Sequence, residues 1–515
     1  MDALSAALKA AQRGHLVLEI IAPNGDVYRF AERDIQVEDT GGPRLFKCAL
    51  TSSLSVATNF DFRTPSYAVS KVNVAIRNDG RLQDVDLDGS RASVYLWAEG
   101  LTWTEIEAAG LLFSGAFSMD SWDRSILSAT LTDDTFDGLG EIPGVIISAD
   151  TWPDHRVEGG AGSVAGLAAP LVLGDFRRGV PLVCVDTVNF KYLAALGLPE
   201  STDADYNSVI EAVYDKDGAA IGAANFSLAV GPDGEGNVCA VFTFIADQAA
   251  SEPLSCSLKG LADRSGKFAK TAGDLVSHPA DLVHYLLANF SRLTPDKIDV
   301  GALKTLRSAL TGVNFGAVVN EASTVRDVSA RFLSQCSAAL VARSGKVGAV
   351  GLFPDATVRK AIDSATQSIA RSASFARTPL DMLANDITVK YAYNPLQKAY
   401  EGVLTRGKKE NAEADKSQFR HGKKSLVLEC PDARDADTAA TLADRFLTLN
   451  AGRHDLLDIT LPIWEGATLL EGDAAEITIP EGPSADGAGW NAEKMILVSR
   501  TITGTGVRLK FWRAA

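Results

Sequence analysis

Short β-type segments separated by turn residues occupy both ends of the chain, and this pattern most limits the folds open to it. Near the N-terminus, His15 to Ile21 and Val27 to Phe30 flank the turn Pro23-Asn24-Gly25-Asp26. Asn-Gly between two apolar runs is a strong hairpin signal, because both residues tolerate positive φ. Further strand segments follow at short spacing: Tyr67 to Ile76, Ala92 to Glu99, Leu111 to Met119 and Ile126 to Thr132. The spacing predicts a β-barrel-like domain over residues 15–135, after an N-terminal helical arm at 1–14.

The other end of the chain returns to the same pattern. Asp386 to Tyr393 alternates as a strand, and a helical period over about 435–450 places Leu442, Phe446 and Leu449 on one side. Closing strands are predicted at Leu457 to Pro462, Ala474 to Ile479 and Met495 to Phe511, the last split by Gly504-Thr505-Gly506. Between them, Arg406 to Lys424 holds seven basic and three acidic residues and is interpreted as a solvated loop. We therefore expect a second β-barrel-like domain with one helix over 385–515.

The middle of the chain divides into two further units. Residues 136–270 predict a β-rich insertion domain, with a flexible linker at Gly159 to Gly166 and hairpin-like turns near Asp217-Gly218 and Asp233-Gly234. From 271 to 384 the period becomes helical, over Pro279 to Phe290 and over Thr324 to Cys336 with Ser323 as N-cap, before a hairpin around Ser344-Gly345. The fold class that follows is α+β and multidomain.

Charge and cysteine usage exclude several classes of protein. The formal charge is −15, from 50 Lys and Arg against 65 Asp and Glu, which argues against a surface that holds nucleic acid through its phosphates. The sequence contains no run of about 18 apolar residues, so we expect no stable membrane insertion. The N-terminus lacks the pattern of a signal peptide, so we expect the product to be made and assembled in the cytoplasm. The six cysteines are too far apart for zinc knuckles or CxxC pairs and are interpreted as buried thiols: Cys48, Cys184, Cys239, Cys256, Cys336 and Cys430.

A search for catalytic groups finds no convincing constellation. The six histidines are His15, His155, His278, His284, His421 and His454, and no serine occupies a Gly-x-Ser-x-Gly elbow. Asp281 and His284 share a helix with an apolar stripe, so a core or rim histidine is favoured over a base. Phosphate-binding glycine loops are absent from the sequence. We therefore expect no enzyme activity, no catalytic residues and no cofactor.

Acidic residues offer the nearest approach to a metal or glycosidase site. Asp84, Asp86 and Asp88 match the opening of a calcium loop, but the twelfth position, which needs Glu, is Tyr95 in a predicted strand. An acidic turn is the favoured interpretation, and whether it binds an ion is left open. The carboxylates Asp133-Asp134 with Asp137, or Glu105 with Glu107, cannot be assigned as a catalytic pair without geometry.

Four phrases of the sequence, in order, resemble the baseplate hub or tail-tip family of long-tailed, siphophage-type bacteriophages. They are Val72 to Leu82, Pro170 to Val183, His278 to Leu287 and Leu469 to Ile479. The resemblance implies a ring of subunits, a trimer, in which two β-rich domains per copy match a sixfold tail tube to a threefold tip. It also implies a channel for the tape-measure protein and for DNA in passing, with distal tail or tail-tube proteins and tip or fibre proteins as partners, in the tail tip of the virion.

An alternative from another class is a polysaccharide-active or carbohydrate-binding β-rich protein. This alternative predicts a cleft with converging carboxylates and a platform of aromatic side chains. The chain has seven tryptophans from which a platform could be built: Trp97, Trp103, Trp122, Trp152, Trp464, Trp490 and Trp512.

Overall fold

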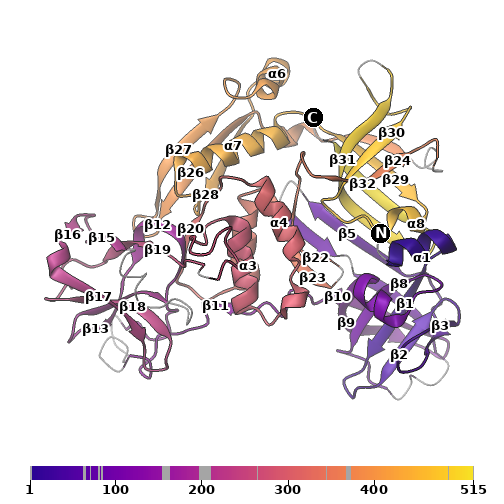
Figure 1. Ribbon diagram of the computed structural model, residues 1–515, viewed down its shortest axis with the longest axis horizontal. Coiled ribbons are helices and arrows are strands. Elements are labelled where there is room, and N and C mark those ends of the chain that lie inside the picture. The colour runs from indigo at the N-terminus through magenta and orange to yellow at the C-terminus, as the bar shows by residue number, and fades with distance from the viewer. Residues whose placement is uncertain are drawn as a thin grey trace.

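The computed structural model shows several sheets and short helices arranged as an arch (Figure 1). It describes residues 3–61, 65–69, 71–78, 82, 85–152, 163–196, 210–263, 265–343, 345–366, 373–484 and 487–513. Within these residues there are eight α-helices, and strands dominate the two ends of the chain. The predicted α+β, multidomain fold class is confirmed. The first half of the predicted linker, residues 159–162, lies outside the described residues.

The N-terminal sheet has eight strands in the order β3-β4-β2-β1-β8-β9-β10-β7. The predicted hairpin at Asn24-Gly25 is confirmed, since β1 and β2 pair antiparallel from Ile21 with Val27 to Val17 with Ala31. The strand order does not close into a barrel, but a bridge between Leu50 and Ile76 links the chain after β4 to β7. The strands are β1 (His15–Ile21), β2 (Val27–Ala31), β3 (Ile35–Val37), β4 (Arg44–Cys48), β7 (Val72–Arg77), β8 (Arg91–Trp97), β9 (Leu111–Trp122) and β10 (Ile126–Asp133).

The C-terminal sheet has the order β24-β30-β31-β32-β29-β25. Its long strand β31 has a second set of partners, because β5 (Ser55–Asp61) pairs antiparallel with the last part of β31 and β6 (Ser66–Val69) pairs with β5. Two strands from the first 70 residues therefore belong to the C-terminal sheet. The remaining strands are β24 (Val358–Asp363), β25 (Ser374–Arg377), β29 (Asp455–Leu461), β30 (Ala474–Ile479), β31 (Trp490–Thr503) and β32 (Val507–Arg513).

The two end sheets share one hydrophobic core. Buried side chains from residues 4–131 and from residues 362–511 form a single cluster, which includes Leu18 and Phe117 from one sheet and Leu457 and Phe511 from the other. Helix α1 (Ala3–Ala11) contacts both α2 (Trp103–Ala109) and α8 (Ile463–Gly466) across the seam. Burial of apolar surface on both sides of a seam opposes movement between the two sheets.

A helical unit lies in the middle of the arch (Figure 1). Helix α3 (Pro279–Phe290) has the predicted bounds, whereas α4 (Val300–Ala309) was not predicted. Helix α5 (Val325–Ser334) is confirmed, but its N-cap is Thr324 and not Ser323, because the Thr324 side chain accepts the hydrogen bond from the Asp327 amide. Helices α4 and α5 pack on the hairpin of β22 (Ala338–Arg343) and β23 (Lys346–Gly351), and α3 packs on both of these helices.

A three-stranded sheet of β27 (Ala399–Arg406), β26 (Asp386–Asn394) and β28 (Ser425–Cys430) is covered on one face by α7 (Ala436–Asn450), which confirms the predicted helix. The interpretation of 406–424 as a loop is wrong over its second half, where α6 (Ala412–His421) forms behind an Asn411 cap. The described part of 385–515 therefore contains three α-helices, where one was expected. Helix α6 is mostly polar, so its sequence carries little of the apolar period on which the prediction depended.

The insertion is β-rich, as predicted. Its two sheets have the orders β16-β15-β19-β12-β20 and β13-β14-β18-β17, and both predicted hairpin turns join paired strands. Strand β20 (Gly316–Val319) comes from the helical unit and attaches the insertion to it. The other strands are β11 (Glu141–Ile142), β12 (Leu171–Pro181), β13 (Val183–Asp186), β14 (Lys191–Leu196), β15 (Ile210–Tyr214), β16 (Ala220–Ile221), β17 (Phe226–Pro232), β18 (Val238–Phe244), β19 (Ser255–Lys259) and β21 (Ser323–Thr324), the last pairing with β11.

Candidate functional site at a charged junction

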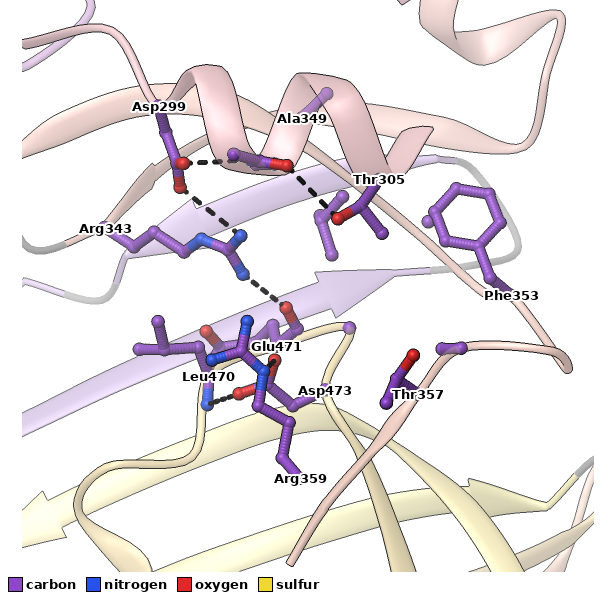
Figure 2. Close-up of a pocket in the computed structure, with 16 residues that line it drawn as sticks. Asp299, Thr305, Arg343, Ala349, Phe353, Thr357, Arg359, Leu470, Glu471 and Asp473 are labelled. Carbon is purple, nitrogen blue, oxygen red and sulfur yellow. Dashed lines mark hydrogen bonds and ion pairs between the residues drawn. The ribbon is translucent and has the colours of Figure 1, made fainter. Parts of the chain in front are cut away.

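A pocket of about 320 Å³ lies where the C-terminal sheet meets the helical unit. Figure 2 shows that the segment Leu470–Asp473 borders it on one side and the first turn of α4 on the other, with Arg343 reaching between them. Gly472 in this segment has φ +88, and a Cβ there would lie 2.6 Å from Val350 Cγ2. The close approach of the segment to β23 thus depends on glycine.

Glu471 is the most deeply buried charged side chain of this junction, with no exposed surface. One of its carboxylate oxygens accepts a hydrogen bond from the Thr58 hydroxyl and lies 3.8 Å from Arg500 Nε. Arg500 is only 4% exposed and donates to the backbone carbonyls of Ala467 and Leu469, at 3.2 and 3.1 Å. Because Thr58 and Arg500 are direct partners in the β5–β31 register, Glu471 lies over the place where the two ends of the chain join.

The backbone of Glu471 extends the network to the helical unit. Its carbonyl accepts a hydrogen bond of 2.7 Å from Arg343 Nη1, and Arg343 Nη2 lies 3.4 Å from an Asp299 oxygen. Asp299 is in turn the N-cap of α4 and accepts from the Ala302 amide at 2.9 Å. One continuous chain of polar contacts therefore connects β5, β31, the 470–473 segment, β22 and α4. Figure 2 shows the part of it from Glu471 through Arg343 to Asp299.

Asp473 closes the segment on itself and on β24. It accepts a hydrogen bond of 2.9 Å from the Leu470 amide, and it lies 3.3 Å from Arg359 Nε. Burial raises the pKa of Asp473 above the ordinary value, while the Leu470 hydrogen bond and the charges of Arg359 and Arg343 act in the opposite direction. The segment is held in a single conformation from both of its ends.

The polar contacts of the junction connect segments of the fold to one another. Its carboxylates are engaged by guanidinium, hydroxyl or backbone donors, and among the described residues no group of three or more His, Cys, Asp or Glu could hold a metal ion. Three buried atoms of the junction, Glu471 Oε2, Arg343 Nε and the Tyr67 hydroxyl, have no hydrogen-bond partner within the described chain. Burial, together with the charge of Glu471, raises the pKa of Tyr67 far above its ordinary value, so this phenol stays neutral.

The residues considered for catalysis lie apart and have structural roles. Asp281 pairs with Arg307 and not with His284, which is half-buried against Phe268 at 5.0 Å between ring centroids. His278 caps α3. His15 and His454 are buried and His421 is exposed, whereas His155 lies outside the described residues. The interpretation of His284 as a rim histidine is supported.

The acidic candidates close turns and cap helices. Asp86 accepts from the Asp88 amide at 3.1 Å, and Asp88 accepts from the Met119 amide at 2.6 Å, while Asp84 lies outside the described residues. Asp133 accepts from Thr135. Glu105 completes the capping box of α2 with Thr102. These hydrogen bonds give the carboxylates structural roles, so their presence in the sequence does not indicate a substrate site.

The tryptophans do not form a common platform. Trp97, Trp103, Trp490 and Trp512 are buried, Trp152 and Trp464 are half-buried, and Trp122 is 57% exposed on β9. The aromatic surface on which the carbohydrate alternative depended is therefore largely internal.

Sequence reasoning did not find the junction. Leu469 to Ile479 was noticed for its resemblance, but nothing in the sequence indicates that Glu471 is buried or that Thr58, Arg343 and Arg500 meet it. The available signal is the string Glu471-Gly472-Asp473 between two apolar runs, which by itself predicts an exposed acidic turn.

No family model matches the chain, no curated protein matches it, and none of the described helices is long and apolar enough to cross a membrane. Solved structures are similar to it over most of its length. The 43 kDa tail protein of prophage MuSo2 from Shewanella oneidensis shares 8% identity, with 97% of this chain and 98% of that chain covered and a TM-score of 0.40. The prophage tail protein gp18 from Listeria monocytogenes EGD-e shares 9% identity, with 97% and 94% covered and a TM-score of 0.34. The p2 virion baseplate in activated conformation shares 10% identity, with 97% and 99% covered and a TM-score of 0.25.

All three TM-scores lie below 0.5, so these comparisons do not by themselves assign a role to the chain. The neighbours are phage tail and baseplate proteins, the kind of protein that the sequence resembles.

Proposed function

We propose that the chain is a structural subunit of a phage tail baseplate or tail tip. In this proposal it forms a trimeric ring that joins the tail tube to the tip and surrounds a channel for the tape-measure protein and DNA. Its partners are distal tail or tail-tube proteins, the tape-measure protein and tip or fibre proteins. It is located in the virion, after assembly in the host cytoplasm, and it has no enzymatic role.

The observation that carries the proposal is the joining of the two ends of the chain. Strands β5 and β6 leave the N-terminal part and extend the C-terminal sheet, and the two end sheets share one core. A ring that adapts sixfold to threefold symmetry needs two β-rich units per subunit in a fixed relative position. The Glu471–Arg500 contact and helix α1 both act to fix that position.

A second supporting feature is the similar construction of the two end sheets. Each is mainly antiparallel, and each has a short helix between two of its strands, α2 between β8 and β9 and α8 between β29 and β30. Both short helices contact α1. Two similar units within one chain are what pseudo-sixfold packing of three copies requires.

An uncovered sheet face supplies a candidate contact between copies. Val403 and Val427 are 65% and 53% exposed, and their register partners are Lys390 and Thr388 on β26. Because α7 covers the opposite face, where Ile387 is buried, both valines lie on the open side of the sheet. Large apolar side chains exposed together on a sheet are typical of an assembly surface.

The net charge of −15 suits a channel through which DNA passes without binding, because like charges repel the phosphate backbone. For the channel we therefore expect an acidic or neutral wall, and purified protein should not retain duplex DNA at physiological salt.

The oligomeric state tests the proposal. Mass photometry of the purified protein, alone and with its tail-tube partner, should show trimers, and image averaging should show a ring with a central opening. The double variant Val403→Glu with Val427→Glu should weaken trimer formation by at least about tenfold, since exposed apolar contacts become charged. Ile245→Glu, at a position 72% exposed in the insertion, is the matched control. Particles that stay monomeric under both conditions would contradict the ring.

A further inference from the structure

A second and larger pocket lies on the helical unit, on the opposite face of α4 from the pocket at the charged junction. Its volume is about 580 Å³, and it is bounded by the loop 266–270, by one side of α3 and by α4 with the turn before it. Volumes of 300–1,000 Å³ are typical of small-molecule sites. The function proposed above makes no use of this pocket, so the inference that follows does not depend on that function.

The floor of the pocket is apolar and its rim is cationic. Phe268, Ala288, Leu293, Ile298 and Leu303 contribute carbon surface to the lining. The charged side chains of the lining are Lys267, Lys270, Lys304 and Arg307 against the single carboxylate of Asp281. The lining of this pocket is therefore positively charged, although the formal charge of the whole chain is −15.

The one carboxylate is already neutralised. Asp281 is 5% exposed and forms an ion pair with Arg307, which joins α3 to α4 at the pocket edge. None of the three lysines of the lining forms an ion pair with a described residue. Three positive charges therefore remain for an occupant. Burial lowers the pKa of His284, and the charges of Lys267 and Lys304 act in the same direction while that of Asp263 opposes them.

The loop that forms one wall is held in place by hydrogen bonds and ring contacts within the protein. Asp263 is 3% exposed and accepts hydrogen bonds from the amides of Phe268 and Ala269, at 2.5 and 2.7 Å. The Phe268 ring lies 5.0 Å from the His284 ring and 5.4 Å from the Tyr285 ring, measured between centroids. A preformed wall reduces the ordering cost of binding.

We propose that this pocket binds a small anionic amphiphile, with an apolar body on the floor formed by Phe268, Ala288 and Leu303 and a carboxylate-type head against Lys267, Lys270 and Lys304. A neutral apolar molecule would form no ion pair with the three lysines. A cationic amphiphile would be repelled by them, so the sign of the head group is the distinguishing property of the ligand.

Decanoate is the probe for this site, with decanol and decylammonium as matched compounds of the same chain length. In isothermal titration calorimetry of the intact protein, decanoate should bind saturably below about 1 mM. Decanol should bind about tenfold more weakly, and decylammonium more weakly still. Raising the salt concentration should weaken the decanoate complex alone among the three, because the exposed charges are screened.

Two variants assign the binding to this pocket. Lys267→Gln with Lys304→Gln should weaken decanoate binding by about tenfold and leave decanol binding unchanged, since each exposed ion pair contributes little and two are lost. The matched control, Lys47→Gln with Lys510→Gln, removes the same total charge from exposed positions elsewhere and should bind decanoate as the parent does. Ala288→Phe should fill the floor and remove binding of both decanoate and decanol, with the melting temperature measured to exclude unfolding.

Any of three results overturns the proposal. These are the absence of saturable decanoate binding up to about 1 mM, equal affinity for decanoate and decanol, or an unchanged decanoate affinity in the Lys267 and Lys304 variant.

Discussion

Replacement of Glu471 by glutamine should destabilise the junction strongly although the two side chains have nearly the same shape. Glu471 has no exposed surface, and Arg500, its ionic partner at 3.8 Å, is 4% exposed. In the Glu471→Gln protein the guanidinium charge of Arg500 stays buried, and its remaining hydrogen-bond acceptors are the carbonyls of Ala467 and Leu469. Removal of one partner of a buried ion pair costs about 3–5 kcal/mol.

A double-mutant cycle separates this loss from a general disturbance. Glu471→Gln with Arg500→Met removes both charges, and it should recover about 2 kcal/mol relative to the sum of the two single changes, because neither charge is then left alone. Asp458→Asn breaks the exposed Arg508–Asp458 pair, in which Arg508 is 66% exposed, and should cost at most about 1 kcal/mol.

Hydrogen exchange of the β5 amides measures the effect without assuming that 515 residues unfold in one step. A loss of 3 kcal/mol corresponds to about a hundredfold faster exchange in β5 of the Glu471→Gln protein, and β1 should change much less. If β5 exchange changes by less than about twofold, or if the double variant is no better than the sum of the single ones, the charged junction does not hold β5 on β31.

Three further predictions concern other parts of the chain. His278 accepts a hydrogen bond from the Ala280 amide through Nδ1, and burial lowers its pKa to about 4. The neutral imidazole therefore stabilises the fold above pH 6.5, and up to about 3 kcal/mol of the free energy of unfolding should be lost as the pH falls from 6.5 toward 4. Urea unfolding at several pH values measures this loss. Cys48 is the exposed thiol among the six, so a thiol reagent should modify one cysteine in the native protein and six after denaturation, and more than one fast thiol would contradict the burial of the other five. Gly472→Ala should lower stability by about 1–3 kcal/mol, because φ is positive there and the new Cβ would meet Val350; an unchanged melting temperature would count against the close approach.

Local patterns were sufficient for much of the secondary structure. The Asn24-Gly25 hairpin and the bounds of α3 and α7 follow from signals within a few residues, namely turn chemistry, capping and apolar period. The interpretation of the cysteines as buried thiols holds for five, and burial raises the pKa of Cys239 and Cys430 to about 12. Cys48 is the exception, because it lies at the exposed end of β4.

Long-range pairing could not be predicted in the same way. No strand is predicted at the position of β5, and no property of Ser55–Asp61 indicates a partner more than 400 residues away. The same limit applies to the site, since the neighbours of Glu471 in the sequence do not indicate that its side chain is buried or which distant residues it contacts. The division into the five units 1–14, 15–135, 136–270, 271–384 and 385–515 therefore stays a prediction, because strands from one range complete sheets in another.

The junction explains why an acidic residue is buried where an apolar one would be more stable. Apolar replacements for a buried ion pair are often equal or better in stability, so the pair has value mainly as a constraint on register. A shift of β5 by one residue along β31 would turn Thr58 away from Glu471 and place the neighbouring side chain there instead, because side chains alternate between the faces of a sheet. Apolar contacts alone would tolerate such a shift more easily than a hydroxyl–carboxylate–guanidinium triad does. The buried charges of Glu471 and Arg500 thus specify one alignment of the two ends of the chain, which is the property that a subunit with two fixed β-rich units requires.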